Sequence, residues 1–356
     1  MKHLTADLIA EQAAQMCRSR HVHGAVLAVL HAPSGARYVS AAGNLEPERR
    51  FFAASVTKLI VTTVVMRLVE RGLIALDDPM SKYLPAALIA GLHVHNGVDR
   101  TGDITLRHLI SSHTGLRDYF GLKGPDGRSH MAALLSGEDT AWPLERTLDT
   151  VRGLAPRFAP GAPGKVNYSD TNYQLIGRIL ETVTGKDLAS LFAEEVFAPL
   201  GLRETYIYTD PEDGSPAPIH AGQAIARLPN YMASISAEGG MVTTGAELLT
   251  IGEAFFAGRF FDIDALLAQQ NWRMLFWPGQ FHFGLGLEKL WTPWFYSPFA
   301  PVRDVLGFWG QTGAFLFHHP ATGLHFAGTV NQASGWGHSS AVRAMLRIIK
   351  TVQAGQ

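Results

Sequence analysis

The chain of 356 residues contains one cysteine, Cys17, so no disulfide can form within it. A lone cysteine fits a reducing compartment, and its ordinary role is that of a small residue on the buried face of a helix. Charged residues make up only 17% of the sequence and the formal net charge is −1, so the basic excess of a nucleic-acid-binding protein is missing. No uninterrupted apolar run reaches the length of a membrane span. We therefore expect neither a nucleic-acid partner nor a membrane partner.

The first residues lack the pattern of an export signal, because Asp7 and Glu11 interrupt any apolar stretch after Lys2. Together with the lone cysteine, this indicates a cytoplasmic protein. The histidine pairs at 93 and 95 and at 318 and 319 have no third ligand at a fixed spacing, so the sequence predicts no metal site. No cofactor is expected.

Strand-like segments lie near both ends of the chain, with helical patterns between them. Residues 24–30 and 36–42 predict a hairpin, and short apolar or alternating runs return at 283–287, 305–308, 314–318 and 325–330. A sheet assembled from both chain ends, with helical material inserted between them, explains this order. We expect an α+β fold with an antiparallel sheet flanked by helices. Residues 1–60 and 240–356 would form the sheet domain and 61–239 a mainly helical domain, with the active site between them.

The first chemical signal is Ala54-Ser55-Val56-Thr57-Lys58, which is predicted to open a long helix ending near residue 71. Residues three apart share a helix face, so Ser55 and Lys58 can meet, and a serine becomes a nucleophile only when a neighbour accepts its proton. The pattern also fits a helix-capping serine followed by an exposed lysine. The apolar residues 59–66 favour the catalytic interpretation, because they predict a buried helix around Lys58.

Two further segments follow in order, Tyr168-Ser169-Asp170 and Gln311-Thr312-Gly313-Ala314. With the Ser-x-x-Lys segment they resemble the three motifs of the penicillin-recognising serine hydrolases. Residues 72–85, 104–116 and 236–240 are similar to other segments of the branch that contains the class C β-lactamases. The chain is thus identified as a member of this superfamily, which implies a β-lactamase-like fold.

The resemblance also implies roles for individual residues. Ser55 would be the acylated nucleophile, Lys58 and Tyr168 the proton-transfer system with Tyr168 favoured as the base, and the amides of Ser55 and Ala314 the oxyanion hole. The substrate would lie against Asp170, Gln311, Thr312 and Gly313.

Two of these positions depart from the family pattern. Asp170 stands where the family has asparagine, and an ionised carboxylate would keep Lys58 as an ammonium ion that lowers the pKa of Tyr168. Gln311 stands where the family has lysine or histidine, so a substrate that depends on a free carboxylate, such as a β-lactam or a D-Ala-D-Ala peptide, would be used weakly. Alternatively, Arg303 or His338 could supply that charge.

These residues predict a serine hydrolase that acts through an acyl-enzyme on a small-molecule ester or amide, with esterase-like use of substrates lacking an essential carboxylate. The alternatives are a β-lactamase or D-amino-acid peptidase, an acyltransferase, and a catalytically weakened binding protein. Aromatic residues cluster late in the chain and could form core or line an apolar acyl pocket. They include Trp272, Trp277, Trp291, Trp294 and Trp309. The oligomeric state cannot be predicted.

Overall fold

The computed structural model describes residues 4–124, 126–275, 281–292, 301–333 and 335–355. Its main feature is an eight-stranded sheet with the order β10-β11-β12-β13-β14-β15-β1-β2, in which every neighbouring pair is antiparallel. The strands are β1 (Gly24–His31), β2 (Ala36–Gly43), β10 (Arg273–Met274), β11 (Phe281–Phe283), β12 (Glu288–Leu290), β13 (Val305–Trp309), β14 (Ala314–His319) and β15 (Leu324–Thr329). The predicted antiparallel sheet built from both ends of the chain is confirmed.

The strand predicted at 283–287 is wrong, because the chain turns there between β11 and β12. The amide of Gly284 donates to the carbonyl of Leu287 at 2.9 Å and closes this turn. Gly286 has a φ of 66°, and a β-carbon on it would lie 2.3 Å from the hydroxyl oxygen of Thr62. Only glycine suits both the left-handed backbone and the close approach of the neighbouring helix.

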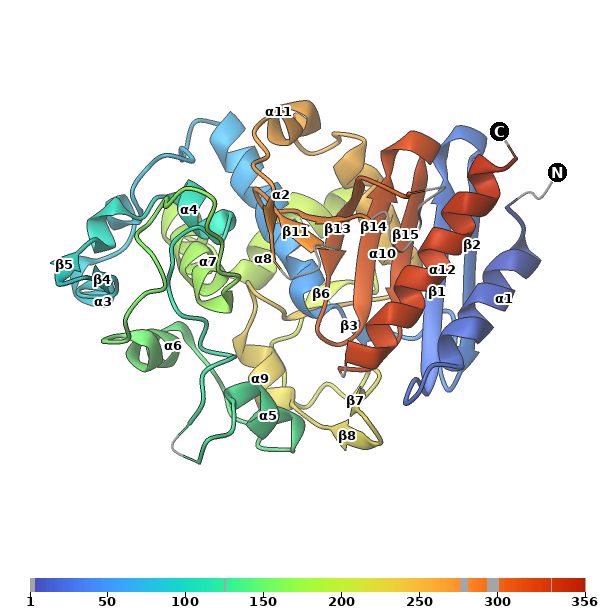
Figure 1. Cartoon of the computed structure of the whole chain (residues 1–356), viewed down its shortest axis with the longest axis horizontal. Coiled ribbons are helices and arrows are strands. Elements are labelled where there is room, and N and C mark those ends of the chain that lie inside the picture. Colours follow the sequence, from blue (N-terminus) through green and yellow to red (C-terminus); the bar gives the residue numbers. More distant parts are fainter. Residues whose placement is uncertain (1–3, 125, 276–280, 293–300, 334, 356) are drawn as a thin grey trace.

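Helices cover both faces of the large sheet (Figure 1). Helices α1 (Ala6–Cys17) and α12 (Gly335–Gln353) pack on one face, and α10 (Gly245–Phe256) packs on the other. Successive side chains of β1 point to opposite faces of the sheet. Leu27 and Val29 pack with α1 and α12, while Ala28 and Leu30 join the core on the α10 side. Cys17 is half-buried at the end of α1.

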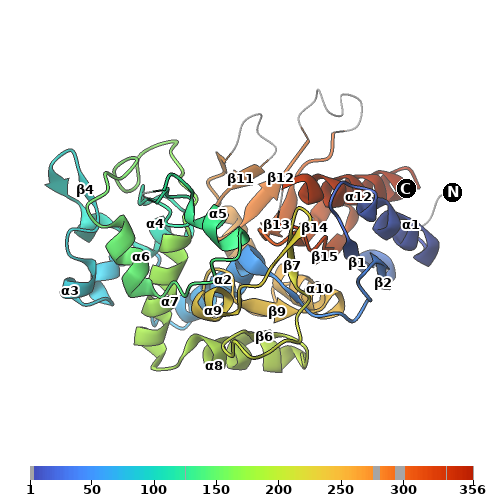
Figure 2. The same ribbon diagram turned by 90° about the horizontal axis from the view of Figure 1, so that it is seen from below.

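The rest of the fold is mainly helical and lies beside the sheet (Figures 1 and 2). At its centre is α2 (Thr57–Glu70), whose residues are almost all buried. Around it lie α4 (Leu106–Ile110), α5 (His130–Leu135), α6 (Leu144–Val151), α7 (Asp170–Thr184), α8 (Leu188–Phe192), α9 (Pro229–Ser234) and α11 (Ile263–Ala268), with the short α3 (Ala86–Ile89). The division into domains at residues 60 and 240 stays a prediction.

Small sheets complete the arrangement. The strands β3 (Phe51–Phe52), β9 (Met241–Thr243) and β6 (Tyr206–Ile207) form a three-stranded sheet in the order β3-β9-β6. Two hairpins, β4 (Val94–His95) with β5 (Val98–Asp99) and β7 (Ile219–Ala221) with β8 (Ala224–Ala226), lie at the periphery. Within the described residues, we find no helix with the length and apolarity needed to cross a membrane.

Candidate active site

Ser55 lies in a single 3-10 turn, Ala54–Val56, and α2 begins only at Thr57. The sequence predicted the helix itself but not this separate turn. Ala54 has a φ of 46°, an unfavourable conformation for a residue with a β-carbon. The hydroxyl of Thr57 donates to the Ala54 carbonyl at 2.7 Å and accepts from the amide of Met241 at 3.1 Å. These bonds hold the strained turn in place and fix the position of the Ser55 hydroxyl.

Lys58 is fully buried, and its ammonium group has three oxygen acceptors. Its Nζ donates to Ser55 Oγ at 2.9 Å and to the carbonyl of Glu238 at 2.7 Å, and lies 2.7 Å from Asp170 Oδ1. An ammonium group has three protons to donate and no lone pair to accept with. The arrangement therefore fits a charged Lys58 that is compensated by Asp170 and donates a proton toward Ser55.

Tyr168 precedes α7, and its hydroxyl interacts with the side chain of Ser55. Its ring packs edge-on against Phe283, with 5.5 Å between the centroids. Burial raises the pKa of Tyr168 well above its usual value, the carboxylates of Asp170 and Glu288 raise it further, and only the bond with Ser55 acts in the opposite direction. The expected lowering of the Tyr168 pKa by Lys58 is therefore wrong. Burial of the phenol dominates, and the positive charge of Lys58 is compensated by the nearby carboxylate of Asp170.

The third motif is held directly against the nucleophile turn. The hydroxyl of Thr312 donates to the carbonyl of Phe52 at 2.7 Å. A β-carbon on Gly310 would lie 2.3 Å from the Ala53 carbonyl oxygen, so only glycine allows this approach. Strand β14, which begins at Ala314, also contacts the turn that carries Ser55. The structure thus brings all three motifs together, and the oxyanion role of the Ser55 and Ala314 amides stays a prediction.

In the part of the chain that the structure describes, neither Arg303 nor His338 takes the place of the family's lysine or histidine at Gln311. The amide of Gln311 donates to the carbonyl of Ala333 at 2.7 Å. Burial lowers the pKa of His338 to about 4, so this residue is neutral at pH 7. Arg303 is exposed and does not line either cavity at Ser55. The alternative that Arg303 or His338 supplies the missing charge is therefore not supported.

Three carboxyl groups near Lys58 were not predicted as site residues. Asp118 accepts from the amide of Asp170 at 3.0 Å, and burial together with the charge of Asp170 raises the pKa of Asp118 to about 7. Glu288, on β12, accepts from the amide of Trp309 at 3.0 Å, and burial raises its pKa to about 8. Burial also raises the pKa of Glu238 well above its usual value.

Sequence signals for these carboxyls are faint. Asp118 comes two residues after the segment 104–116, and Glu288 follows a Gly-Leu-Gly-Leu run. Neither lies at a fixed spacing from Ser55, so only the fold reveals their place.

Ser55 faces two cavities of different size. The larger, about 920 Å³, is also lined by Tyr168, Asp118 and Glu288 and by one side of α12. The smaller, about 60 Å³, is lined mainly by apolar side chains from α5, β7 and α9 and their flanking residues. Asp170 and Gln311 border both. The nucleophile therefore has separate spaces for two parts of a substrate.

The tryptophans of the aromatic cluster have different surroundings in the structure. Trp291 and Trp309 line the larger cavity. Trp272 does not, and instead packs its ring against the ammonium group of Lys289, 4.8 Å from the centroid. Trp277 and Trp294 lie outside the described residues. Two of the tryptophans named thus line a cavity beside Ser55, and their role in an acyl pocket stays a prediction.

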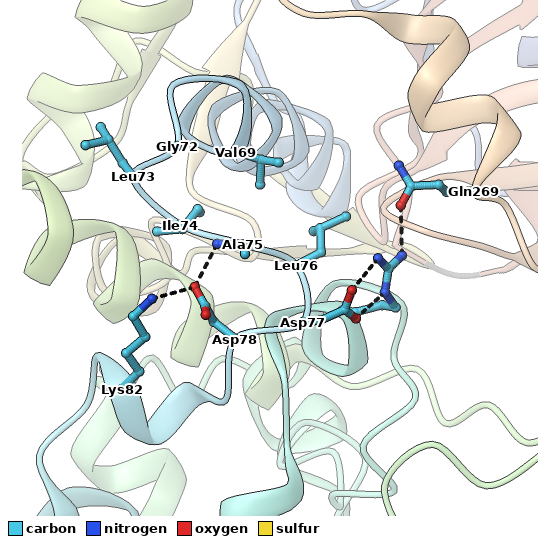
Figure 3. Close-up of a pocket in the computed structure, with 11 residues that line it drawn as sticks. Val69, Gly72, Leu73, Ile74, Ala75, Leu76, Asp77, Asp78, Lys82 and Gln269 are labelled. Atoms are coloured by element: carbon cyan, nitrogen blue, oxygen red, sulfur yellow. Dashed lines mark hydrogen bonds and ion pairs between the residues drawn. The ribbon is translucent and has the colours of Figure 1, made fainter.

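A third hollow, of about 400 Å³, lies on the surface beyond the end of α2 and contains none of the motif residues (Figure 3). Its charged side chains neutralise one another: Arg107 pairs with Asp77 at 2.7 Å and Lys82 with Asp78 at 3.0 Å. We find no cluster of three or more histidine, cysteine or acidic side chains suited to a metal ion in the described part of the chain.

Comparison with known proteins identifies the family. A model of the Beta-lactamase family matches residues 5–348. This chain belongs to the Beta-lactamase family. The predicted superfamily is therefore confirmed, and the fold and the joined motifs agree with it.

Two curated relatives show the range of activities in this family. The D-alanyl-D-alanine-carboxypeptidase/endopeptidase AmpH of Escherichia coli strain K12 is 27% identical over 209 residues, which are 58% of this chain and 49% of that protein. Esterase EstB of Burkholderia gladioli is 30% identical over 184 residues, 49% of this chain and 45% of the relative. The matched part therefore spans about half the length of these relatives.

A solved structure of a D-stereospecific amidohydrolase from Streptomyces sp. superposes with a TM-score of 0.76. It covers 96% of this chain and 98% of its own, at 23% identity. This likeness shows that the whole β-lactamase-like fold is shared.

Proposed function

We propose that this protein is a serine hydrolase that cleaves a small-molecule ester or amide through an acyl-enzyme on Ser55. The observation that carries the proposal is the contact of Ser55 Oγ with both Lys58 Nζ, at 2.9 Å, and the hydroxyl of Tyr168. Nucleophile and proton-transfer group lie within hydrogen-bond reach of each other, as acyl transfer requires. Family members that carry names of esterase and peptidase activities support this reaction class.

The protonation of these groups suggests how the proton moves. Lys58 donates to Ser55 and is surrounded by acceptors, so it acts as a fixed positive charge beside the reacting oxygen. Tyr168, with its raised pKa, is a neutral phenol at rest. During acylation Ser55 passes its proton to the Tyr168 oxygen while Tyr168 passes its own proton to the leaving group. This relay needs no tyrosinate and ends with Tyr168 neutral again.

The neutral Gln311 favours an esterase-like substrate over a β-lactam or a D-amino-acid peptide. A carboxylate beside the scissile bond would find the amide of Gln311, already donating to Ala333, and the carboxyl groups of Asp118 and Asp170. Like charges raise the cost of bringing an anion to this position. We propose that substrates with a carboxylate adjacent to the scissile bond are used poorly.

A direct test uses p-nitrophenyl acetate, a benzylpenicillin-type β-lactam and a D-Ala-D-Ala peptide as substrates in parallel. We expect hydrolysis of the ester to exceed that of the other two by at least about tenfold in kcat/KM, and to vanish in Ser55→Ala. Preferred hydrolysis of the β-lactam or peptide would overturn the esterase-like assignment. Retained ester hydrolysis in Ser55→Ala would overturn the role of Ser55.

A further inference from the structure

The two cavities at Ser55 suggest what kind of ester the site takes, an inference that rests on the proposed function. The small cavity, about 60 Å³, has an apolar wall. Its apolar lining includes Phe120, Leu135, Ile219, Leu228, Met232 and Ile235. A water-sized group occupies about 10–15 Å³ on this measure, so the cavity holds about four to six such groups. It therefore accommodates a short apolar chain and excludes a long one.

Tyr168 decides which part of the substrate lies in which cavity. It lines the large cavity and is absent from the lining of the small one. The group that protonates a leaving group must be within reach of the leaving oxygen. The leaving alcohol therefore lies in the large cavity beside Tyr168, and the acyl chain points into the small one.

The large cavity has acidic, apolar and basic parts in its lining. Asp118 and Glu288 line it together with Ser55, and Trp291 and Leu346 contribute apolar surface. Arg343 is an exposed cation on α12 that donates to Ser339 Oγ at 3.2 Å. His338, Val342, Leu346 and Lys350 also line it, at the four-residue intervals of one helix face. From His338 to Lys350 this face extends about 18 Å along the helix.

We infer that the substrate is a short-chain acyl ester, of up to about four acyl carbons, of a large amphipathic alcohol that carries an anionic group away from the scissile bond. Ser55 Oγ bonds to the acyl carbon, and the bond from that carbon to the alcohol oxygen breaks. The alcohol leaves with the Tyr168 proton, and Tyr168 takes the Ser55 proton. Water then attacks the acyl-enzyme, and the short carboxylic acid is released. Arg343 binds the distant anion.

The acyl side is tested with p-nitrophenyl esters of two to ten acyl carbons. We expect kcat/KM to fall at least about tenfold beyond four carbons. Leu135→Phe, which fills the small cavity from a partly exposed position, should shift the preference to shorter chains, and Met232→Ala should extend it. The matched control Leu346→Phe adds the same bulk to the large cavity and should leave the acyl preference unchanged. Equal use of all chain lengths, or a shift in the control, would overturn the assignment.

The alcohol side is tested with 12-acetoxydodecanoate and its methyl ester, which differ only in the remote charge. We expect the carboxylate to be hydrolysed with a kcat/KM about five- to tenfold higher than that of the methyl ester. This ratio corresponds to the free energy of one ion pair that is exposed or partly buried. Arg343→Gln should abolish this difference. Arg347→Gln is the control, because Arg347 is exposed on the same helix, pairs with Glu11 at 3.5 Å and does not line the cavity.

The two proposals can fail separately. Hydrolysis of p-nitrophenyl acetate without any preference for short acyl chains or for the remote carboxylate would overturn the substrate class alone. A remote-charge preference that survives Arg343→Gln would overturn the role of Arg343. Inactivity toward every ester, with no acyl adduct on Ser55, would overturn both the substrate class and the proposed function.

Discussion

The two sides of Ser55 differ in charge. On the helical side, α2 and the start of α7 place Lys58, Asp170 and, through its contact with Asp170, Asp118 around the nucleophile. On the sheet side, the loop between β13 and β14 presents Gln311 and Thr312, which are neutral. Among the described residues, charge is thus concentrated where a proton must move, whereas the loop that would meet a carboxylate beside the scissile bond presents neutral side chains. The residues proposed to carry out acyl transfer and those proposed to select the substrate therefore lie on different sides of Ser55.

The largest effect should come from removing the cation on the helical side. Lys58→Met deletes the charge that contacts Ser55 Oγ and leaves the carboxylate of Asp170 without its partner. We expect kcat/KM for p-nitrophenyl acetate to fall about 10³-fold or more. Lys82→Met is the control, since Lys82 lies in the distant surface hollow (Figure 3) and should change the rate little. Rates within tenfold of wild type in folded Lys58→Met would contradict a role in acyl transfer.

A somewhat smaller loss is expected when the proton relay is removed. Tyr168→Phe deletes the hydroxyl that bonds to Ser55 and should lower kcat about 10²- to 10⁴-fold. The matched variant Tyr173→Phe removes another buried hydroxyl, which donates to the carbonyl of Ile110 at 3.1 Å, from a ring that also faces Lys58 at 5.2 Å. That variant should lose stability and retain most of its activity. Similar losses of kcat in both variants would argue against a specific relay through Tyr168.

Adding a charge to the sheet side should have a moderate effect. Gln311→Lys places a cation where the family usually has one, and we expect kcat/KM for substrates with a carboxylate beside the scissile bond to rise about tenfold. Hydrolysis of neutral p-nitrophenyl esters should change much less. Gln223→Lys adds the same charge at an exposed position away from the cavities and serves as the control. No gain for carboxylate substrates would show that Gln311 does not set this selectivity.

The smallest effect on activity is expected from Glu288→Gln, which acts mainly on stability. The pKa of Glu288 is raised from 4.5 to about 8, so the folded protein holds a proton that the unfolded chain has lost between these values. Its contribution to the free energy of unfolding therefore decreases as pH rises from about 4.5 to about 8, by an amount on the order of a few kcal/mol, and is constant above that. Urea unfolding at pH 5 and pH 8 should show a smaller decrease for the variant than for wild type. Equal decreases would indicate that Glu288 is ionised in the folded state.

Part of the fold and site could be predicted because the evidence is local. The spacing of Ser55 and Lys58 and the apolar residues after them predicted a buried lysine next to a serine, and Lys58 is fully buried. The strand patterns at both ends of the chain predicted the sheet. In contrast, the turn at 284–287 depends on the approach of Thr62 to Gly286, a contact between residues far apart in the sequence.

The electrostatics of the site could not be predicted for the same reason. The pKa of Tyr168 depends on burial and on the carboxyl groups of Asp170 and Glu288. Glu288 lies on β12, far from Tyr168 in the sequence. The sequence is compatible with a cationic His338, whereas its neutral state follows from its burial beside Trp309. Desolvation is a property of the packed fold, which a motif in the sequence does not report.

The central claim, that Ser55 is the nucleophile of an acyl-transfer site, is tested most directly by labelling the protein with a fluorophosphonate and locating the adduct by mass spectrometry. One adduct per chain on the peptide containing Ser55, reduced strongly by Lys58→Met and absent in Ser55→Ala, is the predicted result. A folded protein that remains unlabelled at Ser55, or that is labelled equally in Ser55→Ala, would contradict the claim.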